Sequence, residues 1–319
     1  MVEEVLRRQP HCYGLGYLHR IAAAAAYAGL ARQHQWLARL VYSVADLHYL
    51  RLARQAAAEA RPELLRAARA VREQELLAMR QVDAVITHSG AEAEWLGREA
   101  PGVRVQVVPW SVRPWPLPRP PVERDGVLLV ANFAHAPNLD GAVWLVTEVM
   151  PCVWAEQPDI VLTIAGSDLP AGLRPKLTDP RVRLLGHVPD LAPVYGAARL
   201  AVAPLRFGAG LKGKVLEAWA AGLPCAMTPI AAEGFSLTAE HSDTVAEGTA
   251  GLARLIVALH ADTARADRFA RAGRAVLRSV FSRKHEETAL AAATGAPIAA
   301  VASVRSRATV PTDAARLTG

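Results

Sequence analysis

The stretch from Leu200 to Gly234 constrains the fold of this chain more than any other, because a strand, a glycine-rich loop and a helix follow one another within it. The apolar run Leu200–Pro204 predicts a buried strand, and the spacing of apolar residues over Lys214–Gly222 predicts a helix that ends at a glycine. The loop between them carries glycines and lysines, namely Gly208, Gly210, Lys212, Gly213 and Lys214. Backbone amides, the positive end of a helix dipole and lysine charges all favour an anion, so the stretch predicts a phosphate site.

Several kinds of phosphate loop fit parts of this stretch. Gly208, Gly210 and Gly213 form a G-x-G-x-x-G pattern, and Glu233 follows twenty residues after the last of them, as in a dinucleotide fingerprint. That fingerprint opens the first strand–helix turn of its domain, whereas at least three predicted strands come before this one. A near match to the Walker A pattern fails at Val215, where a hydroxyl should bind magnesium. A glycine-rich turn with solvated lysines is the alternative that needs no ligand.

The residues after the loop resemble a known family. The run KVLEAWAAGLP over Lys214–Pro224, followed by Thr228-Pro229 and Glu233-Gly234, is similar to the donor-site block of GT4-type retaining glycosyltransferases, which have the GT-B fold. That family often carries two glutamates eight positions apart. The second corresponds to Glu217, which the resemblance places on the donor ribose. The first falls on Ala209, so the donor-sugar contact of that glutamate is absent or supplied elsewhere.

A second segment also carries the resemblance. The run ANFAHAPN within residues 126–151 is similar to the G-x-F-x-H-x-P-N segment that opens the C-terminal domain of some GT4-like proteins. Many GT4 enzymes place an arginine and a lysine on the donor diphosphate here, and Asn132 and Asn138 occupy those positions. Since two amides cannot supply those charges, we expect Lys212 and Lys214 to bind the anion instead. Asn138 also suits a helix cap.

The first part of the chain resembles the N-terminal domain of GT-B proteins. The strand predicted over Leu40–Val44 leads into a segment similar to the D-L-H-x-L-R segment of some GT4-like proteins, which brings Asp46 and His48 to the carboxyl end of that strand. Ligands of open α/β sheets gather at this end, and the alternative is that His48 only caps a helix. Ser89 and Glu92 form a capping-box pattern for the next helix. No glycine loop opens the domain, so either the chain starts inside it or the domain is degenerate.

The alternation of strands and helices predicts an α/β fold of GT-B type, with two doubly wound Rossmann-type domains facing a cleft and the N-terminal one incomplete. A stiff linker is expected between them, because five prolines fall within Pro114–Pro121. A long charged helix is expected over Ala56–Arg80. The expected units are a partial acceptor-side domain (1–112), the linker (113–125), a nucleotide-sugar-binding domain (126–286) and an Ala-rich mobile tail (287–319).

Charge and cysteine content bear on partners and compartment. The 319 residues carry a formal net charge of +6, with a sequence pI near 9.5 and no run of five like charges, so no nucleic-acid partner is indicated. A diffuse basic surface fits a phosphorylated ligand or an anionic membrane face, and ordinary arginine-rich solvation explains it equally well. The three cysteines stand in apolar sequence and are expected to be core residues in a reducing cytosol. Ile21–Ala31 is too short for a membrane span and predicts a packed Ala-rich helix.

The resemblance implies a retaining glycosyltransferase that uses a UDP- or GDP-type sugar donor as co-substrate and needs no cofactor or metal. The sequence contains no Asp-x-Asp pair, which agrees with a metal-independent site. The acceptor is expected to be a sugar, a lipid or another small molecule. The protein is expected in the cytoplasm, with peripheral contact at the inner membrane face as an open alternative. A non-catalytic nucleotide-binding module, or an inactive truncated homologue, is the rival reading. A P-loop triphosphatase is disfavoured by Val215.

The expected site lies between the two units. Lysines and loop amides would stabilise negative charge on the leaving diphosphate, and residues of the N-terminal domain would contact the acceptor. The expected catalytic residues are Lys212, Lys214, His48 and Asp46. The expected donor-binding residues are Asn132, His135, Asn138, Gly166, Val188, Gly208, Gly210 and Glu217.

Overall fold

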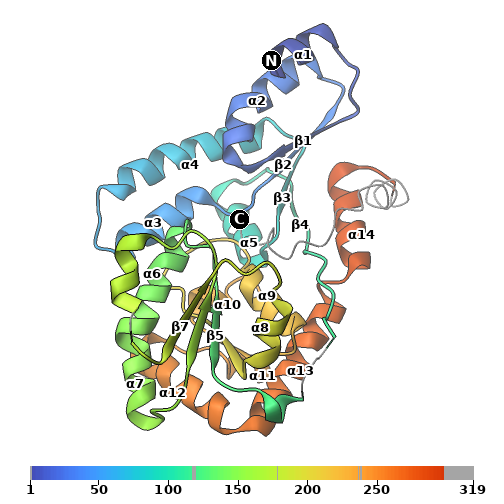
Figure 1. Ribbon diagram of the computed structural model, residues 1–319. Coiled ribbons are helices and arrows are strands. Elements are labelled where there is room, and N and C mark those ends of the chain that lie inside the picture. The colour runs from blue at the N-terminus through green and yellow to red at the C-terminus, as the bar shows by residue number, and fades with distance from the viewer. Residues whose placement is uncertain (1, 117–119, 178, 236, 238, 298–319) are drawn as a thin grey trace.

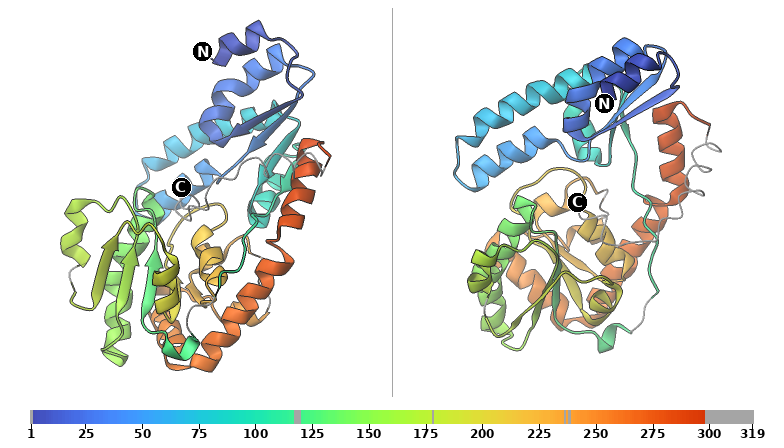
Figure 2. Two further views of the ribbon diagram at one scale, coloured as in Figure 1. Left: turned by 45° about the vertical axis from the view of Figure 1, so that its right-hand side comes forward. Right: turned by 45° about the horizontal axis from the view of Figure 1, so that its top comes forward.

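The computed structural model describes residues 2–116, 120–177, 179–235, 237 and 239–297 (Figure 1). Within them the chain forms two parallel sheets, one of four strands in the order β1-β2-β3-β4 and one of five strands in the order β7-β6-β5-β8-β9. Helices pack around both sheets, and the first unit lies over the second (Figure 2). The α/β class and the two Rossmann-like units expected from the sequence are confirmed.

The first unit contains the four-stranded sheet. Its elements are α1 (Val2–Arg8), β1 (Leu15–His19), α2 (Arg20–His34), β2 (Arg39–Ser43), α3 (His48–Ala58), α4 (Leu64–Arg80), β3 (Ala84–Thr87), α5 (Gly90–Glu99) and β4 (Val105–Val107). Almost all of β2 is buried, as a parallel strand with cover on both faces should be. The buried residues of α2 are Ala24, Ala28 and Ala31, which share one face of the helix, so the packed Ala-rich helix is confirmed.

The long helix expected over Ala56–Arg80 is wrong in its first part. The chain turns at Ala60, whose φ of 53° lies in the left-handed region, and α3 and α4 form an antiparallel pair on either side of it. Glu75 of α4 is fully buried and accepts hydrogen bonds from the backbone N–H groups of His48 at 3.1 Å and Tyr49 at 3.2 Å. A carboxylate from α4 thus satisfies the first turn of α3, a contact that helical periodicity does not reveal.

The second unit contains the five-stranded sheet and follows a 3₁₀ turn (Pro121–Glu123). Its strands are β5 (Val127–Val130), β6 (Leu162–Ala165), β7 (Val182–Gly186), β8 (Leu200–Ala203) and β9 (Cys225–Met227). Its helices are α6 (Ala136–Trp144), α7 (Met150–Glu156), α8 (Ala192–Ala197), α9 (Gly213–Ala220), α10 (Pro229–Ala232), α11 (Ala239–Ser242), α12 (Gly248–Ala261) and α13 (Thr263–Ser279). A π-helical turn (Leu145–Val149) joins α6 to α7, and a 3₁₀ segment (Ala171–Leu177) precedes β7.

Apolar clusters cover both faces of this second sheet. Side chains of α6, α7 and α12 form the cluster on one face, and side chains of α8, α9 and α13 form the cluster on the other. All residues of β5 and β8 are buried, which explains why these strands are continuous apolar runs in the sequence. The loops at the carboxyl ends of the strands are therefore left to bind ligands.

The last described helix, α14 (Arg283–Thr294), returns to the first unit. It packs against β2, β3 and β4 (Figure 2), and its Ala293 is fully buried in a cluster with Ile86. The mobile tail expected from residue 287 is therefore wrong at its start, because residues 287–294 are helical and packed on a sheet distant in sequence. The part of that tail over 298–319 lies outside the described residues.

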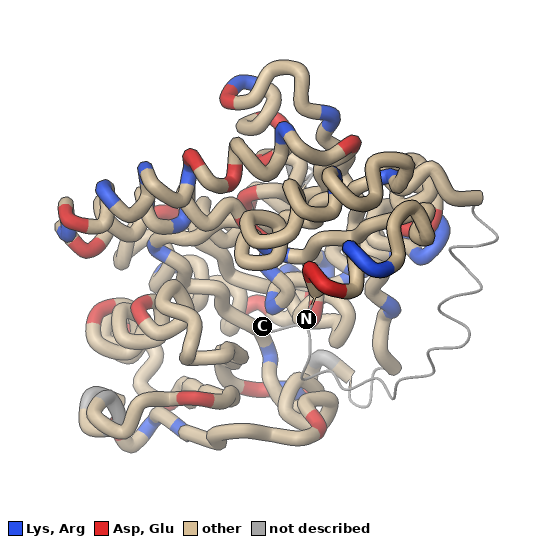
Figure 3. The backbone as a smooth tube through the Cα atoms, turned by 90° about the horizontal axis from the view of Figure 1, so that it is seen from above, with Lys and Arg blue, Asp and Glu red and all other residues tan. Residues whose placement is uncertain are grey.

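The cysteines and the surface differ in part from expectation. Cys225 is buried, as predicted, but Cys12 and Cys152 are exposed, so two of the three are not core residues. Basic and acidic residues are interspersed along both units (Figure 3). None of the described helices has the length and apolar character that crossing a membrane requires.

Candidate functional site

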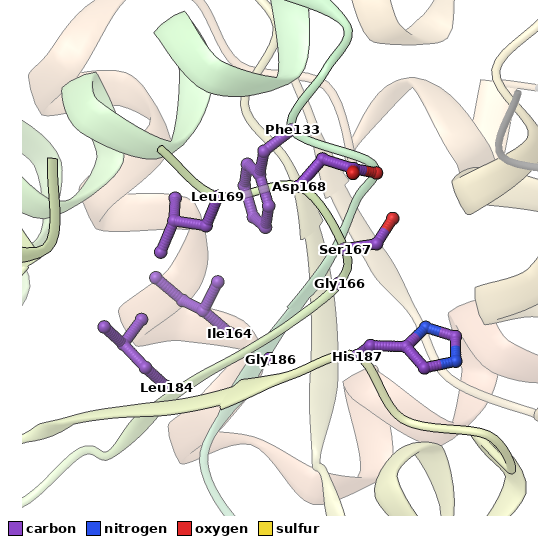
Figure 4. Close-up of a pocket in the computed structure, with 9 residues that line it drawn as sticks. All are labelled: Phe133, Ile164, Gly166, Ser167, Asp168, Leu169, Leu184, Gly186 and His187. Atoms are coloured by element: carbon purple, nitrogen blue, oxygen red, sulfur yellow. The ribbon is translucent and has the colours of Figure 1, made fainter. Parts of the chain in front are cut away.

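The carboxyl ends of β6 and β7 open onto a cavity of about 200 Å³ (Figure 4). Its lining residues are Phe133, Ile164, Gly166, Ser167, Asp168, Leu169, Leu184, Gly186 and His187. The apolar side chains gather on one side, and the polar side chains of Ser167, Asp168 and His187 lie on the other (Figure 4). An apolar wall with a few polar groups suits a flat heterocycle.

Gly166 is essential to the shape of this cavity. A Cβ atom at this position would lie 1.7 Å from the carbonyl oxygen of Ala131, so no side chain fits between the ends of β5 and β6. The Gly166 N–H donates to the carbonyl of Gly186 at 2.8 Å, which ties the end of β6 to that of β7. Val188, predicted beside it, does not line the cavity, because its side chain packs against the cluster that includes α8 and α9.

Lys214 and Asn138 connect the start of α9 to the loop that follows β5. The Lys214 ammonium group donates to Oδ1 of Asn138 at 2.6 Å. Burial lowers the pKa of Lys214 to about 8, which Cys225 and Glu217 partly oppose. The same loop contributes Phe133 to the cavity wall. Lys214 therefore lies at the same edge of the sheet as the cavity, in the first turn of a helix, where an anion is favoured.

The two asparagines hold the loop after β5. Asn132 accepts a hydrogen bond from the Ala134 N–H through Oδ1, and its carbonyl accepts one from the Asn138 amide, each at 2.8 Å. The N-cap residue of α6 is His135, and Asn138 is the third helical residue, so the helix-cap explanation of Asn138 is wrong. Desolvation, followed by the nearby cations, lowers the pKa of His135 to about 4, so its imidazole is neutral at pH 7.

Glu217 is a buried carboxylate with one unpaired oxygen. It lies one helical turn after Lys214 on α9 and is 3% exposed. Its Oε2 accepts a hydrogen bond from the hydroxyl of Tyr195 at 3.0 Å, whereas Oε1 has no partner among the described residues. Burial raises the pKa of Glu217 to about 7, which Tyr195 and Lys214 oppose. A buried acceptor without a donor is costly, so this oxygen is suited to a ligand hydroxyl.

The glycine loop touches the first unit. The Gly210 N–H donates at 2.8 Å to Oε1 of Glu92, and the same oxygen accepts from the Leu47 N–H at 2.8 Å. A Cβ at Gly210 would lie 2.9 Å from the Ala45 carbonyl oxygen, so the close approach requires glycine. The expectation that the Gly210 amide binds phosphate is wrong for this conformation, because a carboxylate from the first unit already occupies it.

Arg54 and Glu233 form a second tie between the units. The guanidinium of Arg54 donates to both carboxylate oxygens of Glu233, at 2.5 and 2.6 Å, and to the Gly208 carbonyl at 2.8 Å. This bidentate geometry is the strongest arrangement of such a pair. Glu233 is thereby engaged by an arginine, which does not fit the dinucleotide interpretation that would place it on a ribose.

Lys212 contacts the glycine loop at this junction, whereas Lys214 contacts Asn138 of α6. It is the N-cap residue of α9, it is 7% exposed, and its ammonium group donates to the Gly210 carbonyl. Burial lowers the pKa of Lys212 to about 8, and the carboxylates of Glu233 and Glu92 oppose that shift. The two predicted loop lysines therefore have different surroundings.

Asp46 and His48 lie beside the same loop, at the end of β2. Asp46 accepts from Nε of Arg51 at 2.7 Å, and its Cβ would lie 3.1 Å from a Cβ at Gly210. His48 is the first residue of α3, after the N-cap residue Leu47, so the helix-cap explanation of its side chain is wrong. Burial and then Arg51 lower the pKa of His48, and Asp46 opposes them. The structure thus brings Asp46 to the junction, and His48 begins α3 two residues after it.

Comparison with known proteins finds a family match within the second unit. Residues 124–262 match the family glycosyl transferases group 1. Over these residues the match confirms the expected resemblance to glycosyltransferases. An uncharacterized 44.6 kDa protein from the cps region of Klebsiella pneumoniae is 32% identical over 117 residues, which span 34% of this chain and 30% of that protein. The chain thus aligns with less than a third of the length of this relative.

Solved structures confirm the GT-B fold. Sucrose-phosphate synthase from Thermosynechococcus elongatus superposes with a TM-score of 0.68 at 18% identity, covering 92% of this chain and 73% of that one. Anabaena HepE, solved in complex with UDP-glucose, superposes with a TM-score of 0.66 at 16% identity, covering 95% of this chain and 82% of that one. At such identities the likeness concerns the fold.

Sequence analysis missed the charged residues that connect elements within the first unit or join that unit to the second. Arg54 and Glu75 carried no signal, because a charged residue in a helical pattern is usually a solvated one. Glu92 was assigned to a capping box, but only half of that box forms: Ser89 Oγ accepts from the Glu92 N–H at 3.4 Å, while the Glu92 carboxylate turns to Gly210. Arg51 could have been singled out from the sequence, because it ends the D-L-H-x-L-R segment that carries the resemblance.

Proposed function

We propose that this protein is a retaining glycosyltransferase that transfers a sugar from a nucleotide-diphosphate donor to a sugar, lipid or other small-molecule acceptor. The observation that carries the proposal is the buried Oε1 of Glu217, which has no partner among the described residues and lies one helical turn from Lys214, the cation at the sheet edge that holds the cavity. A nucleotide diphosphate needs three features in its site: an acceptor for a ribose hydroxyl, a cation for the diphosphate and an apolar cavity for the base. The UDP-glucose complex of Anabaena HepE supports a donor of this class.

The donor is proposed to lie along the carboxyl edge of the second sheet. Its base enters the cavity of Figure 4, its ribose donates to Oε1 of Glu217, and its diphosphate lies against the first turn of α9 and Lys214. The backbone near Gly208, together with Asn132 and His135 from the loop after β5, flanks the diphosphate in this proposal. The acceptor comes from the side of the first unit, where Asp46 and His48 lie.

Catalysis in this proposal rests on charge stabilisation. When the bond between the anomeric carbon and the donor phosphate breaks, negative charge grows on the diphosphate, and a fixed cation lowers the barrier most where that charge develops. Lys214 supplies this cation without a metal ion. Two observations favour the rival function, a non-catalytic nucleotide-binding module. The Gly210 amide donates to Glu92 and not to a phosphate, and asparagines stand at two positions that are usually charged in the family. The cytoplasmic location and a peripheral membrane contact remain predictions.

Donor binding and turnover test the proposal directly. We expect calorimetry to show binding of UDP or GDP with the same dissociation constant in the presence and absence of EDTA. Incubation with UDP- and GDP-sugars should release the nucleotide slowly by hydrolysis, and faster when an acceptor is present. Binding without any release would favour the non-catalytic module, and strict dependence on magnesium or manganese would contradict the metal-independent site.

Replacement of Glu217 tests the ribose contact. A hydrogen bond to a charged group contributes about 1.5–3 kcal/mol, so Glu217→Ala should weaken UDP or GDP binding roughly ten- to hundredfold. Glu94→Ala is a matched control, because Glu94 is an exposed glutamate on a helix of the other unit. Circular dichroism should show both variants folded. A dissociation constant unchanged in Glu217→Ala would mean that this carboxylate does not contact the nucleotide.

A further inference from the structure

Tyr195 lies directly against the carboxylate of Glu217. It belongs to α8, the helix that follows the cavity-lining residues Gly186 and His187, and it is 1% exposed. Its hydroxyl donates to Oε2 of Glu217 at 3.0 Å. A tyrosine in this position can do more than fill the core, because its hydroxyl contacts the carboxylate that the proposed function places on the donor.

The hydrogen bond makes the two oxygens of Glu217 unequal. Without it, the carboxylate could rotate and present either oxygen, because the terminal torsion of glutamate is broad. With Oε2 bound to Tyr195, only Oε1 remains to accept from a ligand. A phenol that donates to a carboxylate also favours the charged form, which burial disfavours.

The interdomain linker holds Tyr195 from its other side. The indole ring of Trp115 packs edge-to-face on the Tyr195 ring, with 5.3 Å between ring centroids and 86° between planes. Trp115 is itself anchored, since its N–H donates to the Ala220 carbonyl at 2.8 Å and its carbonyl accepts from Arg274 at 3.0 Å. Ala220 ends α9, the helix that carries Glu217. The phenol is thereby held between the linker and the carboxylate.

Few charged groups face this pair. Lys214 on α9 is the cation that opposes protonation of Glu217, and Cys225 on β9 lies near both Lys214 and Tyr195. Burial raises the pKa of the Cys225 thiol to about 12, so it is neutral at physiological pH. Arg124 donates to the Ala221 carbonyl at the far end of α9, and Arg274 donates to Trp115 on the linker side. Tyr195 is therefore the neutral donor in direct contact with the carboxylate.

We propose that Tyr195 is a positioning residue for the donor site: it fixes the orientation of Glu217 and holds it as a charged acceptor for the ribose, with Trp115 of the linker bracing it. This inference rests on the proposed function, because it assumes that Glu217 contacts the donor. It adds a residue that never touches the substrate yet decides over which pH range the donor binds.

The pH dependence of donor binding separates this role from packing. Glu217 accepts from the ribose in its charged form, so affinity for UDP or GDP should be full above its pKa and fall as pH decreases through it, near 7 in the wild type. Tyr195→Phe removes a hydrogen bond that favours the charged form, so the fall should occur at higher pH. At pH 7 we expect affinity about five- to tenfold below that of the wild type, and the two curves should converge at pH 9.

Two further variants complete the experiment. Tyr49→Phe removes another buried tyrosine hydroxyl, which bonds to Trp95 in the first unit, and should leave the profile unchanged. Glu217→Gln cannot titrate, so its binding should lose this pH dependence, and adding Tyr195→Phe should then shift nothing. It also keeps the proposal testable if Tyr195→Phe fails to fold, since a wild-type pH profile in Glu217→Gln would overturn the assignment.

The outcomes distinguish the two proposals. Wild-type protein that binds neither UDP nor GDP at any pH between 5.5 and 9 would overturn the proposed function. Wild-type protein that binds them, with a Tyr195→Phe variant of identical affinity and pH profile, would overturn the positioning role alone. A shifted profile in Tyr195→Phe with an unshifted one in Tyr49→Phe would support both.

Discussion

In Lys214→Met we expect turnover to fall by roughly a hundred- to a thousandfold, while the dissociation constant of the nucleotide rises by no more than about tenfold. Charge on the leaving diphosphate grows as the bond to the sugar breaks, so a cation beside it contributes more in the transition state than in the ground state. Lys214 is placed for this role by its hydrogen bond to Asn138 and by its position in the first turn of α9. A cation there is unfavourable for the helix itself, so its removal should not destabilise α9.

Lys212→Met is the matched comparison, because the two lysines lie two residues apart on the same loop. Lys212 donates to Gly210 and faces the carboxylates of Glu92 and Glu233 at the junction. Its loss should therefore lower thermal stability and donor affinity together, with turnover affected only in proportion. Single-turnover rates and calorimetry with one donor decide between the residues. Wild-type turnover in Lys214→Met with lost turnover in Lys212→Met would transfer the catalytic role to Lys212.

Gly166→Ala should abolish nucleotide binding and lower the stability of the second unit by about 3 kcal/mol or more. The added methyl group would lie 1.7 Å from the Ala131 carbonyl, and neither backbone can retreat freely. Ala131 donates to the Ala165 carbonyl at 3.0 Å, and Gly166 donates to Gly186 at 2.8 Å, so relief of the clash breaks the sheet at the mouth of the cavity. For a chain of this size the melting temperature should fall by roughly 10 °C, measured by calorimetry.

Gly97→Ala is a suitable control for that variant. Gly97 lies within α5, and nothing lies within 4 Å of a Cβ built on it. An alanine in a helix interior is favoured over glycine, so this variant should gain about 0.5–1 kcal/mol of stability and bind nucleotide as the wild type does. If Gly166→Ala melted at the wild-type temperature, the ends of β5 and β6 would be able to move apart without loss of stability, and the predicted clash with the Ala131 carbonyl would be contradicted.

Local patterns predicted much of the second unit. The apolar runs of β5 and β8 identified strands, because a strand buried on both faces is apolar throughout. The glycine run, the lysines and the periodic residues after them predicted the start of α9, since each signal acts within a few residues. The family block around Glu217 pointed to the same place, and this glutamate proved to be a buried carboxylate with one oxygen that has no partner in the described part of the chain.

Local patterns failed where a side chain has a distant partner. A glutamate such as Glu75 in a helical pattern is predicted to be exposed to solvent. In the structure it is fully buried and accepts a hydrogen bond from the first turn of α3. The prediction of a long helix over Ala56–Arg80 overlooked the turn at Ala60, although Pro62, which is disfavoured in a helix interior, follows it closely. Residues 287–294 were predicted to be a mobile tail because they show no sustained period. They form part of α14, whose Ala293 packs on the first sheet, and that contact is not visible in the local sequence.

The sequence alone therefore determined the class of fold, the alternation of strands and helices in the second unit, and the glycosyltransferase resemblance, because periodicity and turn chemistry are short-range properties of the chain. Only the tertiary structure decided what the loop glycines and charges do. It placed Glu92 on the Gly210 amide, Arg54 on Glu233, and Tyr195 behind Glu217. The partners in these pairs lie from 22 to 179 residues apart, and no local preference links them. Burial of a polar group forces it to find a partner, and only the folded chain shows which one is within reach.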